Sequence, residues 1–303
     1  MQLVYPEKAK PLVVDPRLSQ VADVSVEWLR RIVERISVPR HFVQQPETNE
    51  AIGHWLEEQF RTFGYQTRFQ GPHRNLMTVP LETKRPVILV GAHYDSVPNT
   101  PGADDNASAV AAMLACAKAV SQYAPRAPVC FVAFNREEEE LTGSKDFVAD
   151  YLPTSGMEIQ AAHVLEMVGY ADDSPGSQRL PAGLPIRVTD RADFLAILGN
   201  RRSTHLVDDV MSCTKSYLAG FPVIGLKIYL GLENRIRHFR RSDHAPFWAA
   251  RIPALMWTDT SEFRNANYHQ PTDTPETLDY EFLARVARLL TVCVLTQLDK
   301  DNQ

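Results

Sequence analysis

Residues 87–96 read Val-Ile-Leu-Val-Gly-Ala-His-Tyr-Asp-Ser, and residues 129–134 read Val-Cys-Phe-Val-Ala-Phe. Both begin as apolar runs of strand length, without the alternation expected of a strand that has one face in water. A helical pattern over about residues 106–121 lies between them. The order strand, helix, strand with apolar strands predicts parallel strands buried in the centre of a sheet.

The same alternation of elements continues along the chain. Helical patterns occupy residues 24–64, and further strands and helices are expected at residues 65–69, 76–81, 163–167, 223–229 and 254–258 (strands) and near 140–152, 203–218, 243–250 and 279–298 (helices). We predict an α/β fold, a single-domain α/β/α sandwich whose central mixed, mainly parallel sheet is flanked by helices. The domain would span residues 1–303, with residues 1–45 as a helical N-terminal extension. The Pro/Gly/Ser-rich run 171–186 fits an active-site loop as well as a domain joint.

Charge and cysteine usage narrow the function classes. The formal net charge is −5, which argues against a nucleic-acid or anionic-membrane surface as partner. The four cysteines form no Cys-x-x-Cys pair and are interpreted as reduced, buried thiols. No run approaches the ~20 apolar residues of a membrane span, and no targeting segment is recognisable. We therefore expect a cytoplasmic protein, unless a leader has been trimmed; the sequence gives no indication of oligomeric state.

Acidic and histidine side chains gather at the expected strand ends. The residues concerned are His93, Asp95, the pair Asp104-Asp105 in Pro-Gly-Ala-Asp-Asp-Asn-Ala-Ser (101–108), the pair Glu137-Glu138, Glu166 and the late His269. Each alone has an ordinary structural explanation, such as a solvated helix start for the run 137–140. Their order and shared location favour a metal site instead. Oxygen and imidazole ligands without thiolates suit catalytic Zn²⁺, Co²⁺ or Mn²⁺.

Over about residues 45–290 the sequence resembles the zinc exopeptidase family that includes bacterial leucyl aminopeptidases, glutamate carboxypeptidase and glutaminyl cyclase. The resemblance rests on His93-Tyr-Asp95-Ser, Pro-Gly-Ala-Asp104-Asp105-Asn-Ala-Ser, Glu137-Glu138 with Gly143-Ser144 following, Leu-Glu166-Met, Ser242-Asp243-His244-Ala-Pro-Phe and Asn267-Tyr-His269-Gln-Pro-Thr-Asp273. It implies the phosphorylase/hydrolase-like fold of that family.

The resemblance also implies a role for each of these residues. Two Zn²⁺ ions per chain, with Co or Mn able to substitute, would be held by His93 and Glu166 (one ion) and by Glu138 and His269 (the other), with Asp104 bridging both, Glu137 as general base and Asp95 orienting His93. A cis peptide bond is expected between Asp104 and Asp105. Asp243 is a weaker candidate for a supporting carboxylate, and His244 is expected to be packed or hydrogen-bonded.

Two positions depart from the family pattern. Glu166 stands where many members have Asp, a replacement that the family accepts. Ala109 stands where Gly usually follows Asp-Asn-Ala-Ser, so the helix there is expected to pack differently.

The predicted function is a di-zinc aminopeptidase that hydrolyses the N-terminal peptide bond with a metal-bridging hydroxide and Glu137 as general base. The partner would be a peptide or aminoacyl small molecule, whose preferred N-terminal residue depends on loops near residues 170–240. Three alternatives stay open: a glutaminyl-cyclase-like zinc acyltransferase, a non-catalytic binding protein on the same fold, and a carboxypeptidase. For the carboxypeptidase, the stretch Arg235–Arg241 is the only suspect for binding a substrate α-carboxylate.

Overall fold

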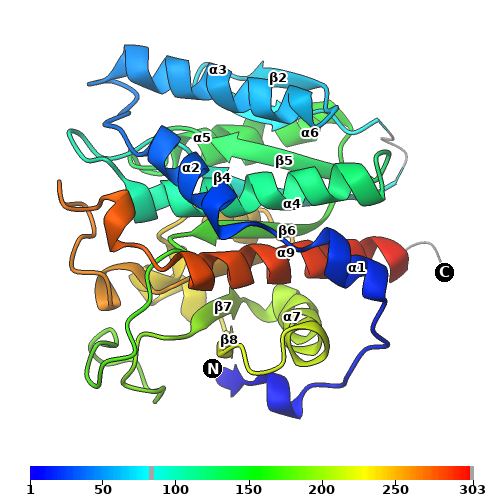
Figure 1. Ribbon diagram of the computed structural model, residues 1–303, viewed down its shortest axis with the longest axis vertical. Coiled ribbons are helices and arrows are strands. Elements are labelled where there is room, and N and C mark those ends of the chain that lie inside the picture. The colour runs from blue at the N-terminus through cyan, green and yellow to red at the C-terminus, as the bar shows by residue number, and fades with distance from the viewer. Residues whose placement is uncertain (82–84, 301–303) are drawn as a thin grey trace.

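The computed structural model describes residues 1–81 and 85–300. Its described strands form a single sheet in the order β1-β8-β7-β9-β6-β4-β5-β3-β2 (Figure 1). The strands are β1 (Gln2–Val4), β2 (Thr67–Gln70), β3 (Asn75–Thr78), β4 (Val87–His93), β5 (Val129–Phe134), β6 (Ile159–Glu166), β7 (Leu195–Gly199), β8 (Val223–Lys227) and β9 (Ala254–Thr258). The helices are α1 (Pro16–Val21), α2 (Val26–Ile36), α3 (Pro46–Thr62), α4 (Ala109–Tyr123), α5 (Thr142–Asp146), α6 (Leu152–Ser155), α7 (Thr204–Tyr217), α8 (His244–Ala249) and α9 (Tyr280–Lys300).

The centre of the sheet is parallel, and antiparallel pairs lie toward its edges. Strands β9, β6, β4 and β5 run in one direction, whereas β3, β2 and β1 pair antiparallel with their neighbours, as does β7 with β9. Every residue of β4 and β5 is buried, which explains their unbroken apolar sequences. The predicted α/β sandwich with a mixed sheet is confirmed.

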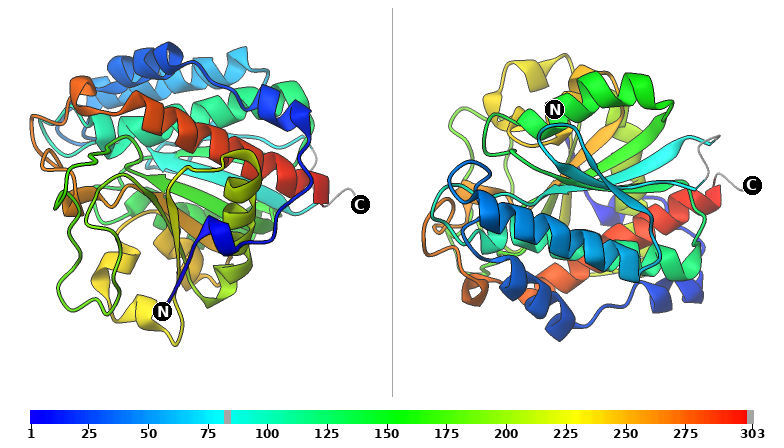
Figure 2. Two further views of the ribbon diagram at one scale, coloured as in Figure 1. Left: turned by 60° about the horizontal axis from the view of Figure 1, so that its bottom comes forward. Right: turned by 90° about the horizontal axis from the view of Figure 1, so that it is seen from above.

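Helices cover both faces of the sheet. Figure 2 (right) shows α3 and α9 on one side and the green helices α5 and α6 on the other. The first face carries the larger core, built by α2, α3, α4, α7 and α9, and the second carries a smaller core with Phe147, Phe247 and Trp248. Helix α4 is apolar nearly all round because it lies between the sheet and α9.

The N-terminal segment differs from the helical extension predicted for residues 1–45, because it also contains a strand. Gln2–Val4 forms the edge strand β1, which pairs antiparallel with β8 (Figure 2, left). Helix α2 begins where Ser25 accepts a hydrogen bond from the backbone N–H of Trp28, and its apolar residues recur at helical spacing against the core. Within the described residues, no helix combines the length and apolarity that crossing a bilayer requires.

Candidate metal centre

The site lies where the central parallel strands end. His93 is the last residue of β4 and Glu166 is the last residue of β6. Glu137 and Glu138 follow β5, whose Phe134 lies directly opposite His93 in the parallel register. Since the carboxyl ends of parallel strands meet at one edge, side chains from distant parts of the chain converge there.

Two groups of side chains meet at this edge. The His93 group comprises His93, Glu137 and Glu166, and the His269 group comprises Asp105, Glu138 and His269. His93 Nε2 lies 3.6 Å from Glu166 Oε2, and His269 Nε2 lies 3.3 Å from Glu138 Oε2. Asp105 joins the groups, because its Oδ1 lies 3.2 Å from His93 Nε2 and its Oδ2 lies 3.2 Å from His269 Nε2.

The prediction that Asp104 lies between the two groups is therefore wrong. The Asp104 carboxylate points away from the site, where Oδ1 accepts a hydrogen bond from the backbone N–H of Gly169 (2.9 Å) and Oδ2 accepts one from Asn265 (2.7 Å). The cis peptide bond is also one residue later than expected, between Asp105 and Asn106. The physical reason for the first difference is the conformation of the loop backbone, which directs the neighbouring side chains of Asp104 and Asp105 to opposite sides.

Several hydrogen bonds fix this loop. Asp273 accepts the backbone N–H of Asp104 (2.9 Å) and that of Asp105 (3.1 Å) through its two carboxylate oxygens. The side chain of Asn106 donates to the carbonyl of Leu165 and accepts from the backbone N–H of Met167, which ties the loop to the end of β6. The loop geometry is thus set by residues from three parts of the chain.

A glycine is required at the start of the same loop. Gly102 has φ 62°, and a Cβ there would lie 2.3 Å from the backbone oxygen of Asp105. Its carbonyl accepts a hydrogen bond (2.9 Å) from the fully buried Arg40, which also donates to the carbonyl of Tyr94 (2.6 Å). Arg40 therefore holds together the two segments that flank His93 and Asp105.

Asp95 lies behind both His93 and the two glutamates. Its Oδ1 is 3.4 Å from Nδ1 of His93, the ring nitrogen opposite the one that faces the site. The same carboxylate accepts the backbone N–H of Glu137 (3.2 Å) and that of Glu138 (3.3 Å). From this position Asp95 can orient the glutamate pair as well as the imidazole, whereas the resemblance implies only the contact with His93.

The segment Ser242-Asp243-His244 adjoins Glu166 through its first residue. Ser242 donates a 2.6 Å hydrogen bond to Glu166 Oε2. Asp243 is fully buried beside it, and burial is the main cause that raises its pKa to about 7. His244 Nε2 donates to the carbonyl of Phe239 at 2.9 Å, so His244 is packed and hydrogen-bonded as expected. Ser242 and Asp273 could have been found only from the distances between motifs in space, not from their spacing in the chain.

The donor set fits divalent cations. Nε2 of His93, Oδ1 of Asp105 and Oε1 of Glu138 are buried at the site without a hydrogen bond within the described residues. Buried polar atoms are normally paired, so a cluster of unpaired lone pairs at one point needs a partner. Imidazole nitrogens and carboxylate oxygens without thiolate are the ligands of catalytic zinc sites.

The histidines of the site are surrounded by negative charge. Burial alone would lower the pKa of His93, but the carboxylates of Glu137 and Glu166 outweigh it and hold that pKa well above its usual value. Burial also acts to lower the pKa of His269, whereas the two carboxylates of its own group raise it to about 10. Without a bound cation, both histidines therefore favour their protonated, positively charged forms.

Burial and neighbouring charges also shift the pKa values of the carboxylates at the site. Burial raises the pKa of Glu137 well above its ordinary value, against the opposing effect of His93. Burial, with the negative charge of Asp105, raises the pKa of Glu138 to about 7. Burial would also raise the pKa of Asp105, but His269 and His93 lower it overall. Positive charge between the two groups would relieve this repulsion.

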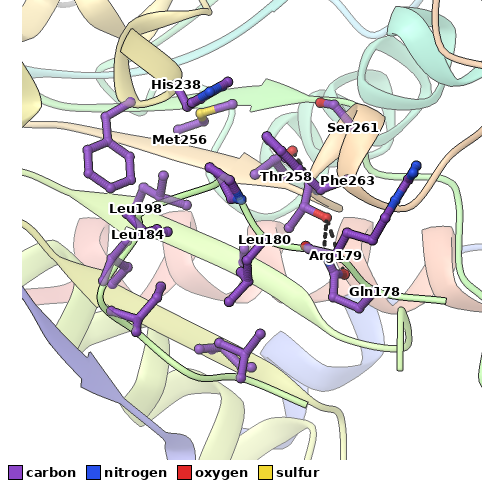
Figure 3. A pocket seen from close by; sticks show the side chains of 18 of the residues that line it. Gln178, Arg179, Leu180, Leu184, Leu198, His238, Met256, Thr258, Ser261 and Phe263 are labelled. Atoms are coloured by element: carbon purple, nitrogen blue, oxygen red, sulfur yellow. Dashed lines mark hydrogen bonds between the residues drawn. The ribbon is translucent and has the colours of Figure 1, made fainter. Parts of the chain in front are cut away.

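Two hollows adjoin the site. The first, the apolar pocket, has a volume of about 120 Å³ and reaches Glu166. Figure 3 shows Leu180 and Leu184 from the long loop, Leu198 from β7, Met256 from β9 and Phe263 around it. The run 171–186 therefore contributes to a pocket at the site, as an active-site loop would. The second, the open cleft, has a volume of about 720 Å³ and is lined by Glu137, Glu138 and His269. Glu166 lines both hollows.

Comparison with known proteins identifies the family. The sequence profile described as "Peptidase family M28" matches residues 76–216 and 222–294, which include every residue of the two groups. The chain belongs to peptidase family M28. The predicted resemblance to the zinc exopeptidases is thereby confirmed.

Individual relatives agree with this assignment. YfbL of Escherichia coli (strain K12) is 35% identical over 228 residues, covering 71% of this chain and 68% of that protein. Aminopeptidase YwaD of Bacillus subtilis (strain 168) is 28% identical over 232 residues, covering 74% of this chain and 44% of that protein. The chain thus spans less than half of YwaD, and about half of fungal relatives described as probable zinc metalloproteases.

Solved structures show the same fold. The LapA aminopeptidase of Legionella pneumophila superposes with a TM-score of 0.72 at 18% identity, covering 95% of this chain and 77% of that chain. BSAP, a zinc aminopeptidase from Bacillus subtilis, gives a TM-score of 0.56 at 25% identity and covers 74% of this chain and 49% of that chain. The enzyme class that the M28 family and these relatives support is a zinc-dependent peptidase, so the predicted class is confirmed.

Proposed function

We propose that this M28 protein is a di-zinc aminopeptidase that removes N-terminal residues from peptides, and that the chain forms one peptidase domain. His93, Asp105 and Glu166 would hold one zinc ion, and Asp105, Glu138 and His269 the other. The observation that carries the proposal is Asp105, whose two oxygens face a histidine of each group at 3.2 Å. When bound, the ions would activate water and polarise the scissile carbonyl.

Glu137 is suited to moving the proton in this reaction. It lies in the His93 group, and the open cleft reaches its side chain. Burial raises the pKa of Glu137, which makes its carboxylate a stronger base than an exposed glutamate. It would take the proton of the attacking water and deliver it to the leaving amine, while Asp95 fixes the backbone on which it stands.

The two hollows suit the two parts of an exopeptidase substrate. The apolar pocket adjoins Glu166, so it would take the side chain of the N-terminal residue. The rest of the peptide would leave the site through the open cleft, which contains Glu137 and Glu138. We therefore expect a preference for apolar N-terminal residues.

Substitution of the proposed base tests this function. Glu137→Gln should lower kcat on a leucyl amide by about 10²- to 10⁴-fold, the usual contribution of a general base, with zinc content unchanged. The matched control is Glu47→Gln, on the exposed first turn of α3, which should keep full activity. Retention of most activity by Glu137→Gln with zinc bound would contradict the proposed mechanism.

The alternatives can be tested on the same samples. A glutaminyl cyclase from Porphyromonas gingivalis shares the fold with a TM-score of 0.64, but at 19% identity the likeness shows the fold alone. A shared fold alone gives no support for cyclisation. We therefore expect an N-terminal glutaminyl peptide to be hydrolysed rather than cyclised. A zinc-loaded protein inert on the whole aminoacyl-amide and dipeptide panel would favour a binding protein instead.

A further inference from the structure

Arginine side chains line one wall of the open cleft. Arg235, Arg237 and Arg240, here called the arginine wall, come from the segment between β8 and α8 and are exposed. Lys145 and Arg241 also line the cleft. These residues share the cleft with the carboxylates of the metal centre, in a chain whose net charge is −5.

Most of this positive charge is not neutralised by the protein. Within the described residues, neither Arg235 nor Arg237 has an acidic side chain at ion-pair distance, and Arg240 donates only to the neutral side chain of Asn234 (3.3 Å). Arg241 differs, because Glu262 pairs with it. Glu233 and Glu140 line the cleft as well, but neither forms an ion pair with the arginine wall.

The positive surface continues beyond the cleft. An adjoining hollow of about 510 Å³ shares Glu233, Asn234, Arg240 and Ala249 with the cleft lining. Three more arginines, Arg201, Arg202 and Arg251, line this hollow and are exposed. A peptide that extends from the cleft into this hollow would therefore meet arginines in both.

The position of the arginine wall places it beside the part of the peptide that follows the scissile bond. The apolar pocket is lined mainly by uncharged side chains and suits the N-terminal residue. The arginine wall lies in the other hollow, on the side of Glu137 and Glu138. Arginine recognises carboxylates with directed, charge-assisted hydrogen bonds.

We propose that the arginine wall selects peptides that carry carboxylates in the segment after the scissile bond. This inference rests on the proposed aminopeptidase function and adds a substrate class to it: an apolar N-terminal residue followed by an acidic leaving segment. The carboxylate can be an acidic side chain or the C-terminal group of a short peptide. The mechanism of selection is electrostatic and acts on substrate binding.

Matched peptides measure this selection. On zinc-loaded wild-type protein, Leu-Glu-Ala amide should have a kcat/KM about three- to tenfold above Leu-Gln-Ala amide, the range expected for exposed charges acting together. Leu-Gln-Ala with a free carboxylate separates the C-terminal source of charge from the side-chain source. The ratio of the kcat/KM values for Leu-Glu-Ala amide and Leu-Gln-Ala amide should approach one at about 1 M salt, where the screening length is about 3 Å.

Charge-removing variants locate the effect. In the double variant Arg235→Gln/Arg237→Gln the ratio of the two kcat/KM values should fall to below about twofold. The control is Arg126→Gln, an exposed arginine in the turn before β5, at the opposite end of that strand from the site, which should keep the wild-type ratio. Equal kcat/KM values in wild type, or a ratio that the double variant leaves unchanged, would overturn the inference.

A binding measurement separates this inference from the proposed function. The Glu137→Gln protein should bind Leu-Glu-Ala amide more tightly than Leu-Gln-Ala amide by the same factor, without turnover. If no peptide is hydrolysed by wild type but this binding ratio holds, the aminopeptidase proposal fails and the acidic selectivity stands. Equal dissociation constants would overturn the selectivity, even where hydrolysis of the neutral peptide supports the aminopeptidase.

Discussion

Asp104 and Asp105 are neighbours in the chain but have different environments. Asp105 faces a histidine of each group, whereas Asp104 is held by Gly169 and Asn265 on the far side of the loop. A carboxylate that faces two imidazoles can join two cations, and one that accepts a backbone N–H and an amide cannot reach them. The two aspartates should therefore respond differently to the same substitution.

Replacing each aspartate by asparagine tests this difference. Asp105→Asn removes the proposed bridging charge and should lower the bound zinc from two ions to one or fewer, with activity reduced by at least about 10²-fold. Asp104→Asn should keep both ions and lose less than about tenfold, because only the loop hydrogen bonds change. Metal analysis and kcat on a leucyl amide measure both effects. Zinc loss in Asp104→Asn with retention in Asp105→Asn would contradict the assignment.

The sequence predicted the loop but not which of its aspartates faces the site. Asp-Asp-Asn after Gly102 marked the position, and the resemblance pointed to Asp104. The side-chain directions depend on how Asp273 and Asn106 hold the backbone, and these contacts join residues up to 169 positions apart. By contrast, strand ends or short motifs marked His93, Glu138, Glu166 and His269 in the sequence, and the structure brings them together in the two groups. Their role as metal ligands stays a prediction.

At the level of elements, one buried histidine connects two strands and a helix. His163 on β6 accepts a hydrogen bond at Nδ1 from the indole N–H of Trp257 on β9 (3.2 Å). Its Nε2 faces Oε1 of Gln297 on α9 at 3.0 Å. The Trp257 bond requires an unprotonated Nδ1, and burial is the main cause that lowers the pKa of His163 to about 4. The folded state therefore favours the neutral form of this imidazole.

This contact should make stability depend on pH. Since the folded pKa is below the unfolded value of about 6.5, the contribution is complete above pH 6.5 and is lost as the pH falls toward 4. The loss amounts to about 2–3 kcal/mol between pH 7 and 4.5. In urea unfolding at pH 7, the His163→Gln protein should have a lower free energy of unfolding than wild type. Between pH 7 and 4.5, however, its free energy of unfolding should fall by about 2–3 kcal/mol less than that of wild type. Parallel pH dependences for wild type and variant would rule the contact out as the cause.

The strands that sequence patterns missed are short or peripheral. Strand β1 has three residues at the sheet edge, and β7 has five residues after the long loop. The three residues of β1 are too few to show an apolar pattern. The apolar run of β7 is as long as that of β9, which was predicted, and it went unrecognised beside the long loop. The central strands β4, β5 and β9 were predicted because burial on both faces makes nearly all of their sequence apolar. Strand β6 was predicted only from residue 163 onward, because Gln160 and His163 interrupt its apolar pattern.

At the scale of the whole molecule, the candidate metal centre is a concentration of buried charge at one edge of the sheet. Asp105, Glu137 and Glu166 are buried there. Neighbouring carboxylates raise the pKa of His93, and burial raises the pKa of Glu137 and of Glu138, so without a cation these side chains favour their protonated forms. Bound cations would replace those protons. Zinc binding is then linked both to folding and to proton release.

Zinc removal should therefore lower the thermal stability of the entire chain. At free zinc about 100-fold above each dissociation constant, two sites would contribute about 5 kcal/mol, and chelation should lower Tm by about 10 °C for a chain of this size. The Asp105→Asn protein, which lacks the proposed bridge, should show a much smaller shift on chelation. Below pH 6 the wild-type shift should also shrink, because protons compete for the same histidines and carboxylates. Differential scanning calorimetry with and without a chelator, at pH 7.5 and pH 5.5, measures all three effects. The control is metal analysis, which must show that the protein carries zinc before chelation. If chelation at pH 7.5 then leaves Tm unchanged, the ions are bound elsewhere than between the two groups.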